Sequence, residues 1–142
     1  MFFVIRQIEV EGSERKPVLF FEDQGEATHL AANRYDDLTQ LLRFIYAQVR
    51  HQAQYRPELR AEIFQFRNRG GAYVPLCIRA GKAILGIIPM LTENPQPGLF
   101  ATARSFLKTY SGAKLLLVHQ GKSDRVLDAD SRIRSIGVSA LL

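Results

Sequence analysis

Residues 63–90 read IFQFRNRGGAYVPLCIRAGKAILGIIPM, and this stretch decides the fold class. Three apolar runs alternate here with two glycine-containing segments: Ile63–Phe66, Gly70-Gly71, Tyr73–Ile78, Gly81-Lys82 and Ala83–Met90. Short runs of aromatic and β-branched residues between such turns are typical of strands that pair in order along the chain. The stretch therefore predicts a three-stranded meander.

A helical pattern precedes the meander. Apolar residues recur at helical spacing from Leu38 to Val49, and Asn33 or Asp36 can cap the start of this helix. Pro57 is expected to end or interrupt it, because the residue before a proline avoids helical torsions. The sequence thus predicts a helix immediately before the first strand of the meander.

A second helix and a further strand are expected after the meander. The residues from Leu99 to Tyr110 again show helical spacing, and Gly112 is expected to close this helix as its C′ glycine. The continuous apolar run Leu115–Val118 predicts a buried strand. The tail Ile133–Leu142 is expected to add a short strand or a helical turn.

The first residues predict a β-hairpin. Phe2–Val10 alternates apolar and polar residues, a polar turn covers Glu11–Pro17, and Val18–Phe21 is apolar again, with a further short strand expected near Thr28–Leu30. We therefore expect one α/β domain over residues 1–142. Residues 1–33 would form an N-terminal hairpin extension, and residues 34–142 an α-β-β-β-α-β core.

Composition excludes several classes of protein. The chain has 142 residues, of which 46% are hydrophobic, and a single cysteine, Cys77, which cannot form a disulfide within the chain. No apolar run approaches the roughly 20 residues that a membrane-spanning helix needs. The apolar start Met1–Ile5 ends at Arg6, too soon for a signal peptide. We expect a cytoplasmic protein without a membrane partner.

Positive charge is concentrated in the middle of the chain. Of the net charge of +5, residues 1–62 contribute −2, residues 63–122 contribute +7 and residues 123–142 contribute none. Such a block attracts phosphates, anionic lipid headgroups or an acidic partner. A solvated basic face without any partner is the simpler interpretation of the same block.

Side chains that bind metals or act in catalysis are sparse. His29, His51 and His119 lie far apart without zinc-ligand spacing, and Cys77 is expected to be a buried, inert thiol. A Ser-His-Asp triad stays open, although no nucleophile-elbow motif identifies one. We expect no metal, no cofactor and no catalytic residue.

One stretch carries a family resemblance. Residues 66–76, FRNRGGAYVPL, together with Gly81–Met90, Ser105–Gly121 and Ile133–Leu142, resemble the nuclease-like domain at the C-terminal end of a family of prokaryotic P-loop ATPases. That domain is a branch of the PD-(D/E)xK, or restriction-endonuclease-like, superfamily, whose core order is helix, three strands, helix, strand. The resemblance covers roughly residues 60–142 and rests mainly on glycines and strand periodicity.

The departures from this family fall on its chemistry. The family's metal-binding Glu and Asp of the second strand correspond to Tyr73 and Pro75, and the Glu and Lys of its third strand to Ile88 and Met90. In such nucleases the carboxylates hold Mg²⁺ against the scissile phosphate. The resemblance therefore implies a degenerate, non-catalytic nuclease-like module. Pro75 also removes a ladder hydrogen bond from a central strand, unless it lies at a bulge.

Two functions follow as hypotheses. The first is nucleic-acid binding through a basic surface, with six candidate contacts: Arg67, Arg69, Arg79, Lys82, Arg104 and Lys108. The second is a protein-interaction or assembly module, homodimeric or with a partner in a phage or mobile-element system, because the hairpin must pack on something. Basic residues gathered on one open face favour the first, and pairing with Asp36, Asp37, Glu58 or Glu62 favours a structural role. An enzyme of an unrelated type is a third alternative.

Overall fold

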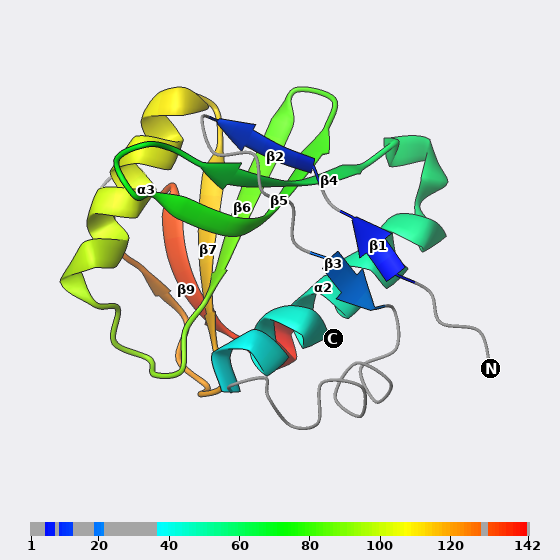
Figure 1. The fold of residues 1–142 in the computed structure, drawn as a ribbon. Coiled ribbons are helices and arrows are strands. Elements are labelled where there is room, and N and C mark those ends of the chain that lie inside the picture. Colours follow the sequence, from blue (N-terminus) through cyan, green and yellow to red (C-terminus); the bar gives the residue numbers. More distant parts are fainter. Residues whose placement is uncertain (1–4, 8, 13–18, 22–36, 129–130, 142) are drawn as a thin grey trace.

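The chain forms a mixed β-sheet with a helix against each face in a computed structural model, which describes residues 5–7, 9–12, 19–21, 37–128 and 131–141 (Figure 1). The described elements, in chain order, are β1 (Ile5–Gln7), β2 (Glu9–Gly12), β3 (Leu19–Phe21), α2 (Asp37–Tyr55), η1 (Pro57–Leu59), β4 (Glu62–Arg67), β5 (Tyr73–Ala80), β6 (Ala83–Pro89), α3 (Pro97–Thr109), β7 (Lys114–His119), β8 (Arg125–Val126), β9 (Ile133–Gly137) and η2 (Val138–Leu141). The fold class is α/β, as predicted.

The main sheet has the strand order β2-β4-β5-β6-β7-β9-β8. β4, β5 and β6 pair antiparallel in sequence order, and their turns place Gly71 and Gly81 at φ of +88° and +60°, which glycine adopts without strain. β7 pairs parallel with β6, and β9 pairs parallel with β7. A parallel pair needs a crossover, and α3 supplies the crossover between β6 and β7.

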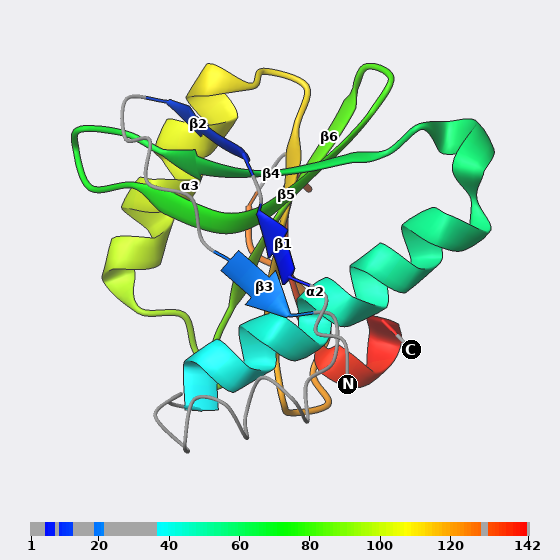
Figure 2. The ribbon, with the colours of Figure 1, turned by 45° about the vertical axis from the view of Figure 1, so that its right-hand side comes forward.

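The two helices cover opposite faces of the sheet, as Figures 1 and 2 show. On one face, α2 buries Leu41, Ile45 and Tyr46 against apolar side chains of β5, β6, β7 and β9. On the other face, α3 buries Ala103 and Phe106 in a separate cluster. Successive residues of a strand point to opposite faces of the sheet, so the same strands contribute side chains to both clusters.

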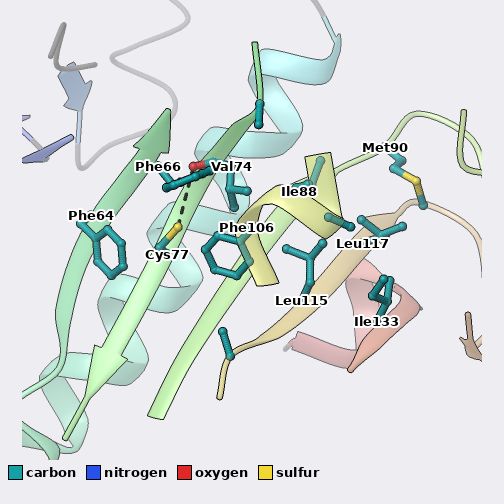
Figure 3. Close-up of a cluster of buried hydrophobic side chains, with 13 residues drawn as sticks. Phe64, Phe66, Val74, Cys77, Ile88, Met90, Phe106, Leu115, Leu117 and Ile133 are labelled. Carbon is teal, nitrogen blue, oxygen red and sulfur yellow. Dashed lines mark hydrogen bonds between the residues drawn. The ribbon is translucent and has the colours of Figure 1, made fainter. Parts of the chain in front are cut away.

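Phe106 lies at the centre of the α3-side cluster, which Figure 3 draws. Its ring contacts Phe66 at a centroid distance of 5.6 Å and Tyr110 at 5.2 Å. Gly86 on β6 leaves room for this ring, since a Cβ there would lie 2.9 Å from Phe106 Cε1. The absence of a side chain at Gly86 therefore sets how closely α3 approaches the sheet. Cys77 is fully buried in the same cluster, as predicted.

The N-terminal residues differ from the predicted hairpin. Ile5–Gln7 pairs antiparallel with Leu19–Phe21, but Glu9–Gly12 forms a separate strand that pairs parallel with β4. The predicted single strand Phe2–Val10 is therefore wrong in part, and Glu11 and Gly12 are not in a turn. Pairing with β2 gives hydrogen-bond partners to the backbone groups on the edge of β4, which would otherwise be unpaired. The strand expected near Thr28–Leu30 lies outside the described residues.

Two details after the meander also differ from prediction. α3 ends at Thr109, and Gly112 does not occupy the left-handed region expected of a C′ glycine. At the end of the helix, the Phe106 carbonyl oxygen instead accepts a hydrogen bond from the Tyr110 N–H at 2.9 Å. The tail forms both expected structures, β9 followed by η2, and β8 was not predicted. No helix among the described residues is long and apolar enough to cross a membrane.

Candidate functional site

The strands β5 and β6 separate at one end of their hairpin. Their pairing runs from Ala80↔Ala83 to Leu76↔Ile87 and stops there. Beyond that point Tyr73 and Val74 stay paired with β4, whereas Ile88 and Pro89 stay paired with β7. The two strands thus diverge beyond Leu76 and Ile87, and a pocket opens at this fork.

The pocket has a volume of about 430 Å³ and is formed by α2, α3 and the two diverging strands. We call it the fork pocket and define it by its lining: Leu38, Thr39, Leu42, Arg43, Tyr73, Pro75, Ile88, Pro89 and Leu99. Three of the four positions that were predicted to correspond to metal-site residues, Tyr73, Pro75 and Ile88, therefore line one cavity. The fourth, Met90, is 5% exposed in the α3-side core.

None of the described residues that line the fork pocket carries a carboxylate. The described part of the chain also holds no group of three or more His, Cys, Asp or Glu side chains arranged for a metal ion. A hard cation such as Mg²⁺ needs several convergent oxygen ligands. The described lining of the fork pocket therefore offers no set of ligands suited to a hard cation.

Pro75 is accommodated in a central strand by a bulge. The register between β4 and β5 shifts between Phe64↔Cys77 and Phe66↔Val74, so two residues of β5 oppose Gln65. The Gln65 side chain, which is fully buried, donates from Nε2 to the Pro75 carbonyl oxygen at 2.9 Å and to the Tyr73 hydroxyl at 3.3 Å. An amide side chain thus bonds two residues that line the fork pocket.

Three of the six predicted basic contacts come together beside α3. Asn68 in the β4–β5 turn donates from Nδ2 to the Ser105 hydroxyl at 2.6 Å, which ties this turn to α3. Arg69 follows Asn68, and Arg104 precedes Ser105, so their backbones lie side by side. Lys108 follows Arg104 by one helical turn. All three basic residues are exposed. We call Arg69, Arg104 and Lys108 the α3 basic surface.

The other three predicted contacts are placed elsewhere. Arg67 faces the α2 side of the sheet, and its guanidinium lies 4.1 Å from the centre of the Tyr73 ring. Arg79 is on the α3 side, but its guanidinium lies 4.5 Å from the Phe64 ring centre and 3.6 Å from the Glu62 carboxylate. Lys82 is exposed in the β5–β6 turn, at the opposite end of β5 from Arg69. The six residues therefore do not share one surface.

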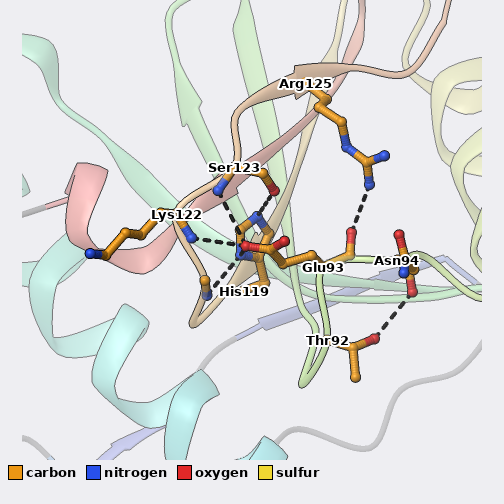
Figure 4. Close-up of polar contacts among 8 residues, drawn as sticks. Thr92, Glu93, Asn94, His119, Lys122, Ser123 and Arg125 are labelled. Atoms are coloured by element: carbon orange, nitrogen blue, oxygen red, sulfur yellow. Dashed lines mark hydrogen bonds and ion pairs between the residues drawn. The ribbon is translucent and has the colours of Figure 1, made fainter.

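A polar network fills the space after the carboxyl ends of β6 and β7 (Figure 4). The Glu93 carboxylate accepts hydrogen bonds from the backbone N–H groups of Lys122 at 2.9 Å and Ser123 at 3.3 Å. These two N–H groups hold the pKa of Glu93 below its ordinary range, because they stabilise the ionised form. The buried His119 ring lies beside them, with Nδ1 3.9 Å from Glu93 Oε1 and Nε2 3.3 Å from Ser123 Oγ.

This Glu-His-Ser arrangement has the order of a catalytic triad but the wrong proton position. The Gly121 N–H donates to His119 Nδ1 at 3.0 Å, so Nδ1 is unprotonated and the ring proton is assigned to Nε2. A triad needs the opposite tautomer, with Nδ1–H on the acid and Nε2 free to accept the serine proton. The imidazole is also fully buried. The network therefore joins two loops rather than activating Ser123.

Sequence reasoning missed the residues that organise these sites. Gln65 and Asn68 are polar residues inside or next to an apolar strand, which is a weak signal without a known partner. Glu93 and His119 are 26 positions apart in the sequence, and only the parallel pairing of β6 with β7 brings their loops together. The comparisons with family models, curated proteins and solved structures find no significant match to this chain.

Proposed function

We propose that this chain is a non-catalytic, restriction-endonuclease-like module that binds nucleic-acid phosphates through the α3 basic surface. The observation that carries the proposal is the junction of Arg69, Arg104 and Lys108 across the Asn68–Ser105 hydrogen bond. Exposed cations on a rigid helix and an adjoining turn supply affinity for the phosphate backbone without reading sequence.

The scarcity of opposing charge supports this proposal. Between residues 63 and 122 the only acidic residue is Glu93. Its carboxylate is occupied by the N–H groups of Lys122 and Ser123, so it does not neutralise the α3 basic surface. α3 itself contains no acidic residue.

The strand order supports the nuclease-like part of the proposal. The series α2, β4, β5, β6, α3, β7 has the helix, three strands, helix, strand order that the resemblance implies. The substitution of the expected ligands by Tyr73, Pro75 and Ile88 supports the non-catalytic part, since none of these side chains can hold Mg²⁺ against a phosphate.

A pair of charge-matched double variants tests the proposal. Arg104→Ser/Lys108→Ser removes two cations from the α3 basic surface, and Lys82→Ser/Lys122→Ser removes two cations from outside it. Both variants have the same net charge. Binding to labelled single- and double-stranded DNA and RNA is measured over a salt series, with and without Mg²⁺.

We expect the affinity of the wild-type chain to fall linearly in log–log plots against salt, without Mg²⁺-dependent cleavage. For duplex DNA the slope should fall in magnitude by about 1.8 in the α3 variant, or about 0.9 for each lost phosphate contact. The control variant should keep the wild-type slope. Absence of binding at low salt, or equal losses in both variants, would reject the proposal and favour the protein-interaction alternative.

A further inference from the structure

The fork pocket resembles a small-molecule site in its volume and lining. Its volume of about 430 Å³ lies in the range of ligand pockets, about 300–1,000 Å³. Six lining side chains are apolar, and they come from α2, both diverging strands and α3: Leu38, Leu42, Pro75, Ile88, Pro89 and Leu99. Apolar walls with a few polar groups are characteristic of pockets that bury the body of an organic ligand.

Two polar side chains of the lining, Arg43 and Tyr73, can donate hydrogen bonds to a ligand, and Arg43 is positively charged. Arg43 is 8% exposed and lines the fork pocket; it has other contacts, but a guanidinium offers five N–H donors. The Tyr73 hydroxyl accepts a hydrogen bond from Gln65 Nε2, so its own proton is directed to another acceptor. The described residues contain no hydrogen bond that this hydroxyl donates. Arg67 adds a second guanidinium behind the Tyr73 ring.

We propose that the fork pocket binds a small amphipathic carboxylate. The apolar body of the ligand lies between α2 and α3, and its carboxylate accepts hydrogen bonds from Arg43 and the Tyr73 hydroxyl. Among the described residues, the lining offers hydrogen-bond donors in Arg43 and Tyr73 and holds no carboxylate that would repel an anion. This site is independent of nucleic-acid binding, since its residues are not part of the α3 basic surface.

Decanoate is a suitable probe, used below its micellar concentration. Titration calorimetry gives stoichiometry and affinity, and amide chemical shifts locate the binding site. Decanol and decylamine have the same chain length without the carboxylate, and decylamine has the opposite charge. We expect saturable binding of one decanoate per chain, with shifts at Leu42 and Ile88, and binding at least about tenfold weaker for both comparators.

Variants separate the fork pocket from apolar surface in general. Leu42→Trp fills the pocket, and Leu38→Trp does the same from a more exposed position, so one of them should fold. Leu59→Trp is the matched control, because Leu59 lines a different apolar groove between α2 and the sheet. The pocket variants should abolish binding, whereas the control should bind decanoate as the wild-type chain does.

A conservative variant tests the polar end of the pocket. Tyr73→Phe keeps the ring under Arg67 and removes only the hydroxyl, and it should weaken decanoate binding by roughly fivefold without changing decanol binding. Tyr55→Phe on the exposed side of α2 is its control. The proposal is overturned if decanoate does not saturate, if decylamine binds as tightly, or if Leu59→Trp reduces binding as much as Leu42→Trp.

Discussion

Glu93 illustrates how one side chain can join two parts of the chain that are distant in sequence. Its carboxylate accepts N–H groups from the loop after β7, and its own carbonyl oxygen accepts a hydrogen bond from Arg125 at 2.9 Å. Gly121 is needed at this place, because a Cβ there would overlap the Glu93 carboxylate. The contact thus depends on one acidic residue and on one residue without a side chain.

This contact predicts a pH-dependent effect of Glu93→Gln. The pKa of the Glu93 carboxyl is lower in the folded chain than in the unfolded chain, because the Ser123 and Lys122 N–H groups stabilise its ionised form. Its stabilising contribution is therefore fully present above about pH 4.3 and is lost as the pH falls through the depressed pKa. Urea unfolding should show Glu93→Gln less stable than wild type at neutral pH, with the difference vanishing in acid.

The control for this prediction is Glu62→Gln, which removes the same charge from an exposed carboxylate that contacts Arg79 at 3.6 Å. Its effect on stability at neutral pH should be smaller, because exposed ion pairs contribute little. An effect of Glu93→Gln that stays constant from neutral to acid pH would show that charge on Glu93 is not what stabilises the contact.

At the scale of elements, the packing of α3 on β6 depends on Gly86. An alanine Cβ would lie 2.8 Å from Leu115 Cδ1 and 2.9 Å from Phe106 Cε1, closer than packed carbon atoms tolerate. We expect Gly86→Ala to lower the free energy of unfolding by about 1–3 kcal/mol. Phe106→Leu also lowers it alone, but in the double variant it makes room for the new methyl group.

The double variant should therefore lose less stability than the sum of the two single variants, by about 0.5–3 kcal/mol. Denaturant unfolding of all four proteins measures this difference. Gly98→Ala is the matched control, because a Cβ at this exposed position of α3 meets no atom within 4 Å. It should be neutral or stabilising. Strict additivity of Gly86→Ala and Phe106→Leu would contradict the proposed clash.

The elements themselves were largely predictable from sequence, because their signals are local. The apolar stripe from Leu38 to Val49 and the run Leu115–Val118 each specify one element, α2 and β7. The position of Glu9–Gly12 could not be predicted, since a parallel pairing with β4 leaves no local trace in β2. A bulge at Pro75 is one way to keep a proline in β5, but the sequence does not identify Gln65 as the side chain that bonds it.

The candidate site was predictable only in part, for a similar reason. The i, i+4 spacing of Arg104 and Lys108 is enough to place them on one face of a helix. Their proximity to Arg69 depends on the Asn68–Ser105 hydrogen bond, which joins positions 37 residues apart. Arg67 was grouped with Arg69 by sequence, but strand alternation places its side chain with Tyr73 on the α2 side. The fork pocket requires strand registers, which composition and spacing do not provide.

At the scale of the whole molecule, the sheet separates two apolar cores. Ile45 is fully buried in the α2-side core, and Ile133 is 6% exposed in the α3-side core. We expect Ile45→Val and Ile133→Val each to cost about 0.5–1.5 kcal/mol. Because the two side chains lie in different cores, the double variant should lose an unfolding free energy equal to the sum of the two single losses, to within about 0.5 kcal/mol.

Ile87→Val provides the comparison for this prediction, since Ile87 belongs to the same core as Ile45. In the Ile45→Val/Ile87→Val double variant, the loss of unfolding free energy should deviate from the sum of the single losses more than it does in the pair on opposite faces. Equilibrium urea unfolding of the single and double variants gives both values. Equal deviations for the two pairs would show that the sheet transmits repacking from one face to the other.

The parallel pairing of β2 with β4 also fixes an order of events during synthesis. Glu9 pairs with Phe64 and Gly12 with Arg67, so β2 leaves the ribosome long before its partner does. Pairings between distant segments form slowly, and an unpaired strand is prone to aggregate. β2 must therefore wait, unpaired, until the first strand of the meander emerges. The nascent chain is exposed to misassembly during this interval, and the arrival of Arg67 at the tunnel exit ends it.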